Sequence, residues 1–197
     1  GEIQAEVRRR QGSVALSTVS KVLRRLEDDL IVGRQSGTIR LLQEDKLLEK
    51  LVANYSPPEI TGRFVGKCAL APQKLFEKLR AWADKSKEAW VGTGTYSLQM
   101  YPSVPRDEKV SLYCTNVGGV REFLGTSVQE TDRFPTLEVL ETQDDTVYFD
   151  PRTTAGSCRM ASPLQTYLEL MAGDKRDRET AERLRPLLLG ALRSDPL

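Results

Sequence analysis

The chain has 197 residues, which is room for one or two domains at roughly 100–200 residues each. Apolar residues make up 39% of it and charged residues 29%, a composition typical of a globular protein with a sizeable core. Histidine is absent, which excludes Ser-His-Asp and Cys-His hydrolases and imidazole-ligated zinc or haem. The formal net charge is only +1, so any surface that binds nucleic acid has to be local.

The cysteines and the apolar runs limit the class of protein further. Cys68, Cys114 and Cys158 contain no CxxC pair, and without histidine they cannot close an ordinary zinc site. We expect reduced thiols, no metal and no cofactor. No apolar run is long enough to span a bilayer, and the start resembles neither a signal nor a transit peptide, so we expect a cytoplasmic protein. The opening glycine predicts that residues are missing upstream.

The first 55 residues are expected to form one domain. A short helical stretch ends at the turn Gln11-Gly12, and a longer helix follows, for which Ser17 is the expected N-cap. Two strands, residues 31–34 and 38–41, flank a glycine-bearing turn, and a connecting helix over residues 44–54 ends before Pro57-Pro58. The longer helix carries an apolar stripe at helical spacing, made of Leu16, Val19, Val22, Leu23 and Leu26.

Residues 59–197 are expected to form a second, mixed α/β domain, which places the whole chain in the α+β class. Strands are predicted over residues 64–70, 90–92, 110–114, 137–140 and 146–149, and an amphipathic helix over residues 72–85. A capping box with proline at the first helical position, Ser162-Pro163-Leu164-Gln165, predicts a helix that ends at Gly173-Asp174. A last helix is predicted over residues 178–189.

The first domain has the order of a winged helix-turn-helix, in which a helix enters the major groove and a hairpin follows it. The helix face opposite the apolar stripe carries small hydroxyls and long cations, which bond phosphates and base edges: Ser17, Thr18, Ser20, Lys21, Arg24 and Arg25. The hairpin, or wing, adds Arg34, Gln35, Ser36, Thr38 and Arg40. Residues 1–40 hold eight Lys and Arg against five Asp and Glu, an excess of three. We therefore predict that these eleven residues bind double-stranded DNA.

Two basic stretches leave alternatives open, and so does the helix face itself, because a charged face is usually just solvated. The run Arg8-Arg9-Arg10 either clamps phosphates or is a solvated basic run. The last predicted helix is either a second DNA contact or, since Glu179 and Glu182 interleave with its cations, a solvated helix with ion pairs. The basic stretch begins just before that helix, and its cations are Lys175, Arg176, Arg178, Arg183 and Arg185.

Three stretches give the sequence a family resemblance. LSTVSKVLRRLEDDLIVGRQSGTIRLLQEDKLLEKLVANY resembles the winged-helix start of the AbiEi-type antitoxins of type IV toxin–antitoxin systems. SPLQTYLELMAGDKRDRETAERLRPLLL is similar to the C-terminal helices of that family, and VGTGTYSLQMYPSVPRDEKVSLYC to its central segment. The resemblance implies a second domain related to the nucleotidyltransferase fold. It also implies a bacterial or phage-related repressor of its own promoter, opposing a nucleotidyltransferase-type toxin without necessarily touching it.

Catalysis by the second domain is not expected. A nucleotidyltransferase needs a Gly-Ser turn for triphosphate and an Asp-x-Asp pair on the next strand for its cations. Gly92, Gly94 and Thr95 offer such a turn, but the strand over residues 110–114 has no acid. Asp107 and Glu108 precede that strand, and Asp144-Asp145 are adjacent, so on a strand they would point to opposite faces.

The expected function is therefore that of a sequence-specific repressor rather than an enzyme. A single winged helix buries only about 600–1,000 Å² on DNA, so one copy should bind a half-site weakly. Two copies on an inverted repeat raise affinity through effective concentration, without new protein surface. The alternative is a generic winged-helix regulator whose second domain senses a ligand or a protein partner.

Overall fold

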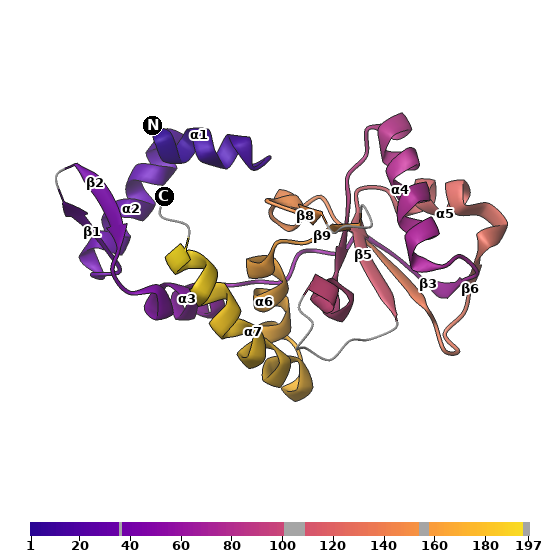
Figure 1. Ribbon diagram of the computed structural model, residues 1–197. Coiled ribbons are helices and arrows are strands. Elements are labelled where there is room, and N and C mark those ends of the chain that lie inside the picture. Colours follow the sequence, from indigo (N-terminus) through magenta and orange to yellow (C-terminus); the bar gives the residue numbers. More distant parts are fainter. Residues whose placement is uncertain (36, 101–108, 154–157, 195–197) are drawn as a thin grey trace.

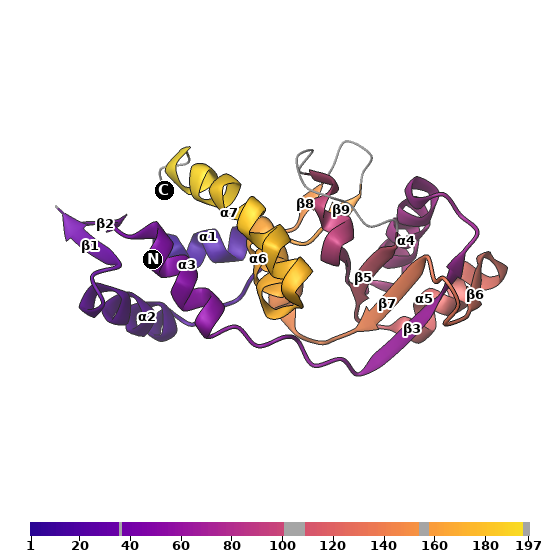
Figure 2. The same ribbon diagram turned by 90° about the horizontal axis from the view of Figure 1, so that it is seen from below.

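The computed structural model describes residues 1–35, 37–100, 109–153 and 158–194. Helices α1 and α2 lie with a two-stranded hairpin at one end of the molecule, and a seven-stranded sheet lies at the other (Figure 1, Figure 2). Helices α6 and α7 lie between these two parts in both views. The wing residue Ser36 and the loop acids Asp107 and Glu108 fall outside the described residues.

The N-terminal part follows the predicted order of elements, which are α1 (Glu2–Arg9), α2 (Leu16–Asp28), β1 (Val32–Gln35), β2 (Thr38–Leu41) and α3 (Glu44–Ala53). The predicted N-cap is wrong. Helix α2 starts at Leu16, one residue before Ser17, and Ala15 occupies the N-cap position without a side-chain hydrogen bond. Ser17 therefore lies inside the first turn, where its hydroxyl stays on the exposed surface.

Both α1 and α2 end in the same way, with a residue other than glycine in the left-handed conformation. After α2, Leu30 has φ +56°, and the N–H of Ile31 donates to the carbonyl of Leu26 over 2.9 Å. After α1, Gln11 has φ +68°, and the N–H of Gly12 donates to Val7 over 2.9 Å. This pattern of bonds satisfies carbonyls at the helix end, but it places a side chain where glycine is usual.

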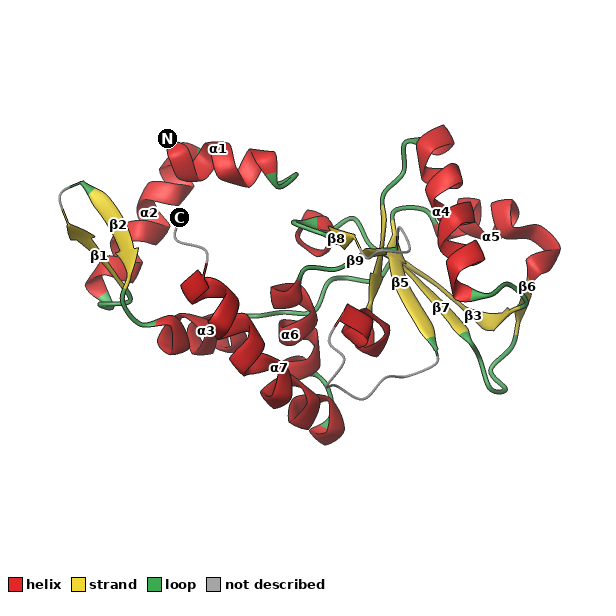
Figure 3. Ribbon diagram, viewed as in Figure 1, coloured by secondary structure: helices red, strands yellow, loops and turns green. Residues whose placement is uncertain are grey.

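The sheet has the strand order β6-β3-β7-β5-β4-β9-β8 (Figure 3). It is mixed, because β5 runs parallel to β7 and β4 parallel to β9, whereas the other neighbours are antiparallel. Its strands are β3 (Gly62–Cys68), β4 (Trp90–Thr93), β5 (Val110–Cys114), β6 (Val128–Glu130), β7 (Leu137–Glu141), β8 (Arg152–Thr153) and β9 (Arg159–Met160). The mixed α+β class is confirmed.

Both faces of the central strands are covered, and the alternation of side chains divides the core accordingly. Helices α4 (Pro72–Ser86) and α5 (Val117–Leu124) lie on one face, where Phe76 and Trp90 stack with ring centroids 5.5 Å apart. Val91 and Tyr113 point to the other face, into a cluster with Val147, Tyr148 and Ala161.

The predicted strand over residues 146–149 is wrong, because Asp145–Tyr148 forms a 3₁₀ helix. The Asp144 carboxylate accepts a hydrogen bond from the N–H of Thr146 over 2.9 Å and so caps this turn. The Tyr148 hydroxyl donates to the carbonyl of Thr142 over 2.9 Å, and this bond joins the end of the 3₁₀ helix to the residues that precede it. A capping aspartate therefore overrode the β-forming side chains that follow it.

The C-terminal helices are α6 (Pro163–Ala172) and α7 (Lys175–Ser194). The predicted start of α6 is confirmed at Ser162, whose hydroxyl accepts from the N–H of Gln165 over 3.1 Å. Among the described residues no return bond joins the Gln165 side chain to the N–H of Ser162, and the Gln165 amide group donates to the Tyr55 hydroxyl and the Glu169 carboxylate. Helix α7 starts before the predicted residue 178 and continues through Pro186. Leu48 of α3 packs into the α6–α7 cluster, which ties the N-terminal part to these helices.

Candidate nucleic-acid interface

The six predicted residues of α2 all lie on its exposed side: Ser17, Thr18, Ser20, Lys21, Arg24 and Arg25. The opposite side is half-buried at Val19, Leu23 and Leu26, and α2 contacts α1 and β1. The packed side is narrower than the predicted stripe, since the side chains of Leu16 and Val22 are 52% and 51% exposed. The structure thus brings the predicted polar residues together on one open helix face.

The long cations of this face differ in what already holds them. The charge of Arg25 acts on Asp29, whose pKa is lowered first by its hydrogen bond to Lys50 and to a smaller extent by Arg25. Lys21 and Arg24 have no hydrogen-bond or ion-pair partner within the described residues. These two side chains can therefore engage an external anion or base edge without breaking an internal bond.

The hydroxyls of α2 are less uniform than the sequence suggests. The Ser20 hydroxyl donates to the carbonyl of Leu16 over 3.0 Å, so its proton is already used inside the helix. Its oxygen can still accept a hydrogen bond from a cytosine or adenine amino group. Ser17 and Thr18 lie in the first turn and are exposed.

The hairpin separates the predicted wing residues between its two faces. Gln35 pairs with Thr38, and Arg40 pairs with Gly33, so Gln35, Thr38 and Arg40 share one face. Arg34 pairs with Ile39 on the other face, and its guanidinium forms an ion pair with Glu27 of α2. The hairpin turns at Gly37, whose φ of +84° favours glycine. Arg34 therefore anchors the hairpin to α2, while Arg40 remains exposed on the other face.

The acids at the end of α2 are partly neutralised by neighbouring cations. Glu27 pairs with Arg34, and Asp29 pairs with Lys50 of α3. Lys46 also donates to the carbonyl of Asp29 over 2.9 Å. Two of the three acids in this stretch are thus held in ion pairs, and the local excess of positive charge is carried by the open face of α2 and by Arg40.

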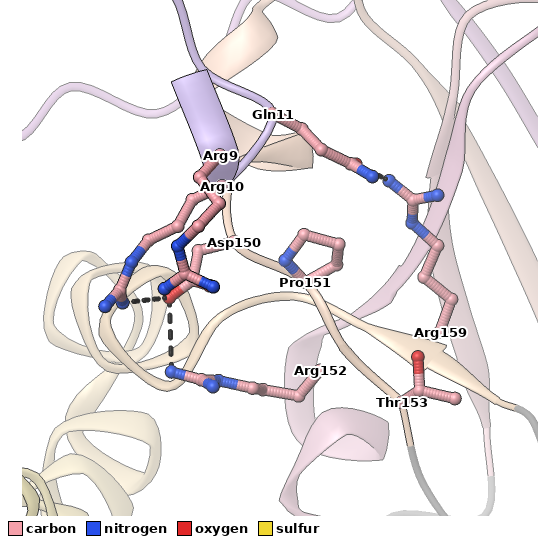
Figure 4. A pocket seen from close by; sticks show the side chains of 8 residues that line it. All are labelled: Arg9, Arg10, Gln11, Asp150, Pro151, Arg152, Thr153 and Arg159. Carbon is pink, nitrogen blue, oxygen red and sulfur yellow. Dashed lines mark hydrogen bonds and ion pairs between the residues drawn. The ribbon is translucent and has the colours of Figure 1, made fainter. Parts of the chain in front are cut away.

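A second basic site lies where α1 meets the sheet (Figure 4). It is a pocket of about 360 Å³ between the end of α1, the loop before β8 and strand β9. Arg10 and Arg152 both bond the Asp150 carboxylate, over 3.1 and 3.2 Å, and Arg159 donates to the Gln11 side chain over 2.7 Å. The residues that line it are Arg9, Arg10, Gln11, Asp150, Pro151, Arg152, Thr153 and Arg159.

The run Arg8-Arg9-Arg10 is therefore not simply a solvated basic stretch. Arg9 and Arg10 bond Glu6, which lowers the pKa of that carboxyl to about 2, and Arg10 extends to Asp150. Nothing in the sequence points to Asp150 as a partner of Arg10, because the two residues are 140 positions apart along the chain. The sequence indicated only that the run Arg8-Arg9-Arg10 is strongly basic and could attract anionic groups.

An acid that the sequence did not point to lies beside the glycine turn at the end of β4. Glu169 of α6 is half-buried beside this turn, and its carboxylate accepts from the Thr93 hydroxyl over 2.5 Å, from Gln165 over 2.9 Å and from the N–H of Gly94 over 3.4 Å. Burial raises its pKa. Within the described residues, no three His, Cys, Asp or Glu side chains cluster as a metal site requires.

Comparisons of the chain with family models, with curated proteins and with solved structures gave no match. In the described part of the chain, every helix is too short or too polar to cross a bilayer.

Proposed function

We propose that this chain is a sequence-specific DNA-binding regulator whose N-terminal part acts as a winged helix-turn-helix. The observation that carries the proposal is the open face of α2, where Lys21 and Arg24 have no partner among the described residues. Long cations on an exposed helix face suit the major groove, where arginine bonds guanine O6 and N7 in a bidentate manner. The hairpin that follows presents Gln35, Thr38 and Arg40 on one face, as a wing would.

The second domain has a regulatory rather than a catalytic role in this proposal. A nucleotidyltransferase would bind triphosphate at the backbone N–H groups of a glycine turn. At Gly94 that position is taken by the Glu169 carboxylate, which would repel a phosphate when ionised. Strand β5, which pairs with β4, carries no carboxylate in its sequence Val-Ser-Leu-Tyr-Cys. Both observations favour a binding protein.

We further propose that the chain represses its own promoter as an AbiEi-type antitoxin does, with two copies on an inverted repeat. This step rests on the sequence resemblance and on the small area that one winged helix offers to DNA. The second candidate is a winged-helix regulator whose other domain senses a ligand. The arginine-lined pocket between α1 and β8 favours it, because the pocket joins the two parts of the chain.

Selection of bound duplexes from a random pool tests the proposal. The wild-type chain should enrich one motif, arranged as an inverted repeat. The variant Lys21→Ala/Arg24→Ala should lose that enrichment, and Arg24→Ala alone should cost about 1–3 kcal/mol on the selected site and relax one base position. Arg133→Ala, on an exposed loop next to edge strand β6, is the matched control. Equal enrichment by the double variant would show that α2 is not the recognition helix.

A further inference from the structure

The arginine-lined pocket is more cationic than its internal partners can neutralise. Arg10, Arg152 and Arg159 contribute three guanidinium groups, and a fourth comes from Arg9. Asp150 is the one acid among the lining residues, and it is shared between Arg10 and Arg152. Glu6 pairs with Arg9 and Arg10 from outside the pocket. The pocket therefore keeps an excess of positive charge on the side of Arg159.

Arg159 is the member of this cluster whose hydrogen bonding is least complete. Its side chain is held by one bond to a neutral group, the Gln11 amide oxygen, at 2.7 Å. Its Nε is buried and has no hydrogen-bond acceptor. No acidic residue forms an ion pair with it within the described residues, and burial lowers the pKa of its guanidinium. A half-buried cation without a counter-ion is costly, and such cost is typical of binding positions.

The shape of the pocket indicates the class of ligand. Its volume of about 360 Å³ is at the small end of the range for small-molecule sites. Pro151 is the one apolar side chain among its lining residues, so an apolar ligand would gain little there. A carboxylate has two oxygens and one charge, whereas a phosphate offers three oxygens and up to two charges to several guanidinium forks at once. Thr153 adds a hydroxyl at the rim.

We propose that the pocket between the end of α1 and strands β8 and β9 binds a phosphate group through Arg159 and Arg152. The phosphate belongs either to a small phosphorylated molecule or to a DNA backbone, and both sources present the same chemistry to the guanidinium groups. Arg152 and Arg159 lie on strands of the sheet, whereas Arg10 is the C-cap of α1 and Gln11 follows it. A phosphate bound by Arg152 and Arg159 would therefore be held by the sheet domain and would lie in the same pocket as Arg10 and Gln11.

The test uses the whole chain and inorganic pyrophosphate at low ionic strength, where screening is weak. Pyrophosphate should raise the thermal midpoint of the wild type, and its dissociation constant should rise at least tenfold in Arg159→Gln and in Arg152→Gln. Arg133→Gln, which removes an exposed arginine beside the opposite sheet edge, should bind as the wild type does. Malonate, a dianion without phosphate geometry, should give a smaller shift than pyrophosphate at equal concentration.

A second readout distinguishes a binding arginine from a structural one. Without ligand, Arg159→Gln should melt at the same temperature as the wild type or higher, because it removes an uncompensated buried charge. If the midpoint falls instead, the bond from Arg159 to Gln11 stabilises the fold, and unchanged pyrophosphate binding by Arg152→Gln then overturns the proposal. Arg152 is exposed, so its substitution keeps the test valid whatever the fold stability of the first variant.

Measurements of duplex binding identify the source of the phosphate. If pyrophosphate has no effect, but Arg159→Gln loses about one unit of salt slope on a duplex while Arg133→Gln does not, the ligand is the DNA backbone. If neither pyrophosphate nor duplex distinguishes Arg159→Gln and Arg152→Gln from Arg133→Gln, the site does not bind phosphate. The pyrophosphate arm contains no DNA, so its result stands apart from DNA recognition by α2.

Discussion

Arg34 of strand β1 forms an ion pair with Glu27 in the last turns of α2. The pair fixes the hairpin against the helix, and it withdraws one wing cation from the surface that the sequence assigns to DNA. Arg40, on the other face of the same hairpin, has no such partner within the described residues. The two wing arginines therefore have different expected roles, although they are indistinguishable in the sequence.

Neutralising each arginine should separate these roles. Arg40→Gln should weaken binding to all duplexes alike and reduce the salt slope by about one unit, because one phosphate contact is lost. The double variant Glu27→Gln/Arg34→Gln keeps the net charge and should retain nearly the wild-type affinity and slope. Titrations of labelled duplex at several salt concentrations measure both. A slope lowered equally in the double variant would mean that Arg34 leaves Glu27 to contact phosphate.

Replacing Leu30 by glycine should stabilise the chain. Leu30 has φ +56° and is 66% exposed, so its side chain contributes strain and little burial. Leu30→Gly should raise the free energy of unfolding by about 1 kcal/mol, the typical cost of a left-handed conformation for a residue with a side chain. Leu51→Gly, inside helix α3, is the control and should lower it by about 1 kcal/mol. Urea unfolding of both variants measures the two changes in the free energy of unfolding, which should have opposite signs.

The caps of two helices give a matched pair of substitutions. Asn116 accepts the N–H of Gly119 over 2.8 Å and caps α5, so Asn116→Ala should cost about 0.5–2 kcal/mol. Ser17 makes no cap bond in α2, so Ser17→Ala should leave the free energy of unfolding within about 0.5 kcal/mol of the wild type. If both substitutions lowered the free energy of unfolding equally, Ser17 would have to act as the N-cap of α2.

Glu169 should make stability depend on pH in a direction opposite to that of most carboxylates. Burial raises its pKa in the folded state above the ordinary 4.5, so the folded chain binds this proton more tightly than the unfolded chain. The resulting stabilisation is complete below about pH 4.5 and is lost as the pH rises through the folded pKa. Glu169→Gln removes this dependence.

Unfolding curves across that pH range check the prediction. The free energy of unfolding of Glu169→Gln minus that of the wild type should increase with pH above 4.5 and then level off. Glu122→Gln, at an exposed position of α5, should show no such trend. A difference that stays constant with pH would mean that the hydrogen bonds from Thr93 and Gln165 offset the burial of Glu169.

Local patterns predicted much of the fold because they are set by nearby residues. The helical spacing of α2, the glycine turn at Gly37 and the cap at Ser162 each specify a structure over a few positions. The strand expected at residues 146–149 failed because a bond from Asp144 competed with strand propensity. The bonds from Arg10 to Asp150 and from Thr93 to Glu169 could not be predicted, since these partners are 140 and 76 residues apart along the chain. Glu27 is only seven residues from Arg34, but their ion pair depends on which face of the hairpin Arg34 takes. The polar face of α2 could thus be predicted from the sequence, whereas the arginine-lined pocket could not.

The end of α1 packs closely against the sheet domain at Gly12. A Cβ on this glycine would lie 2.7 Å from the ring of Phe149, so no larger residue fits without moving the ring. The second connection is Leu48 of α3, which lies in the α6–α7 cluster. The bonds from Arg10 to Asp150 and from Arg159 to Gln11 reinforce the first connection, and the bond from the Gln165 amide to Tyr55 reinforces the second. The N-terminal part is thus attached to the rest of the chain both before α2 and after the hairpin, so a larger side chain at Gly12 would have to move α1 relative to the sheet.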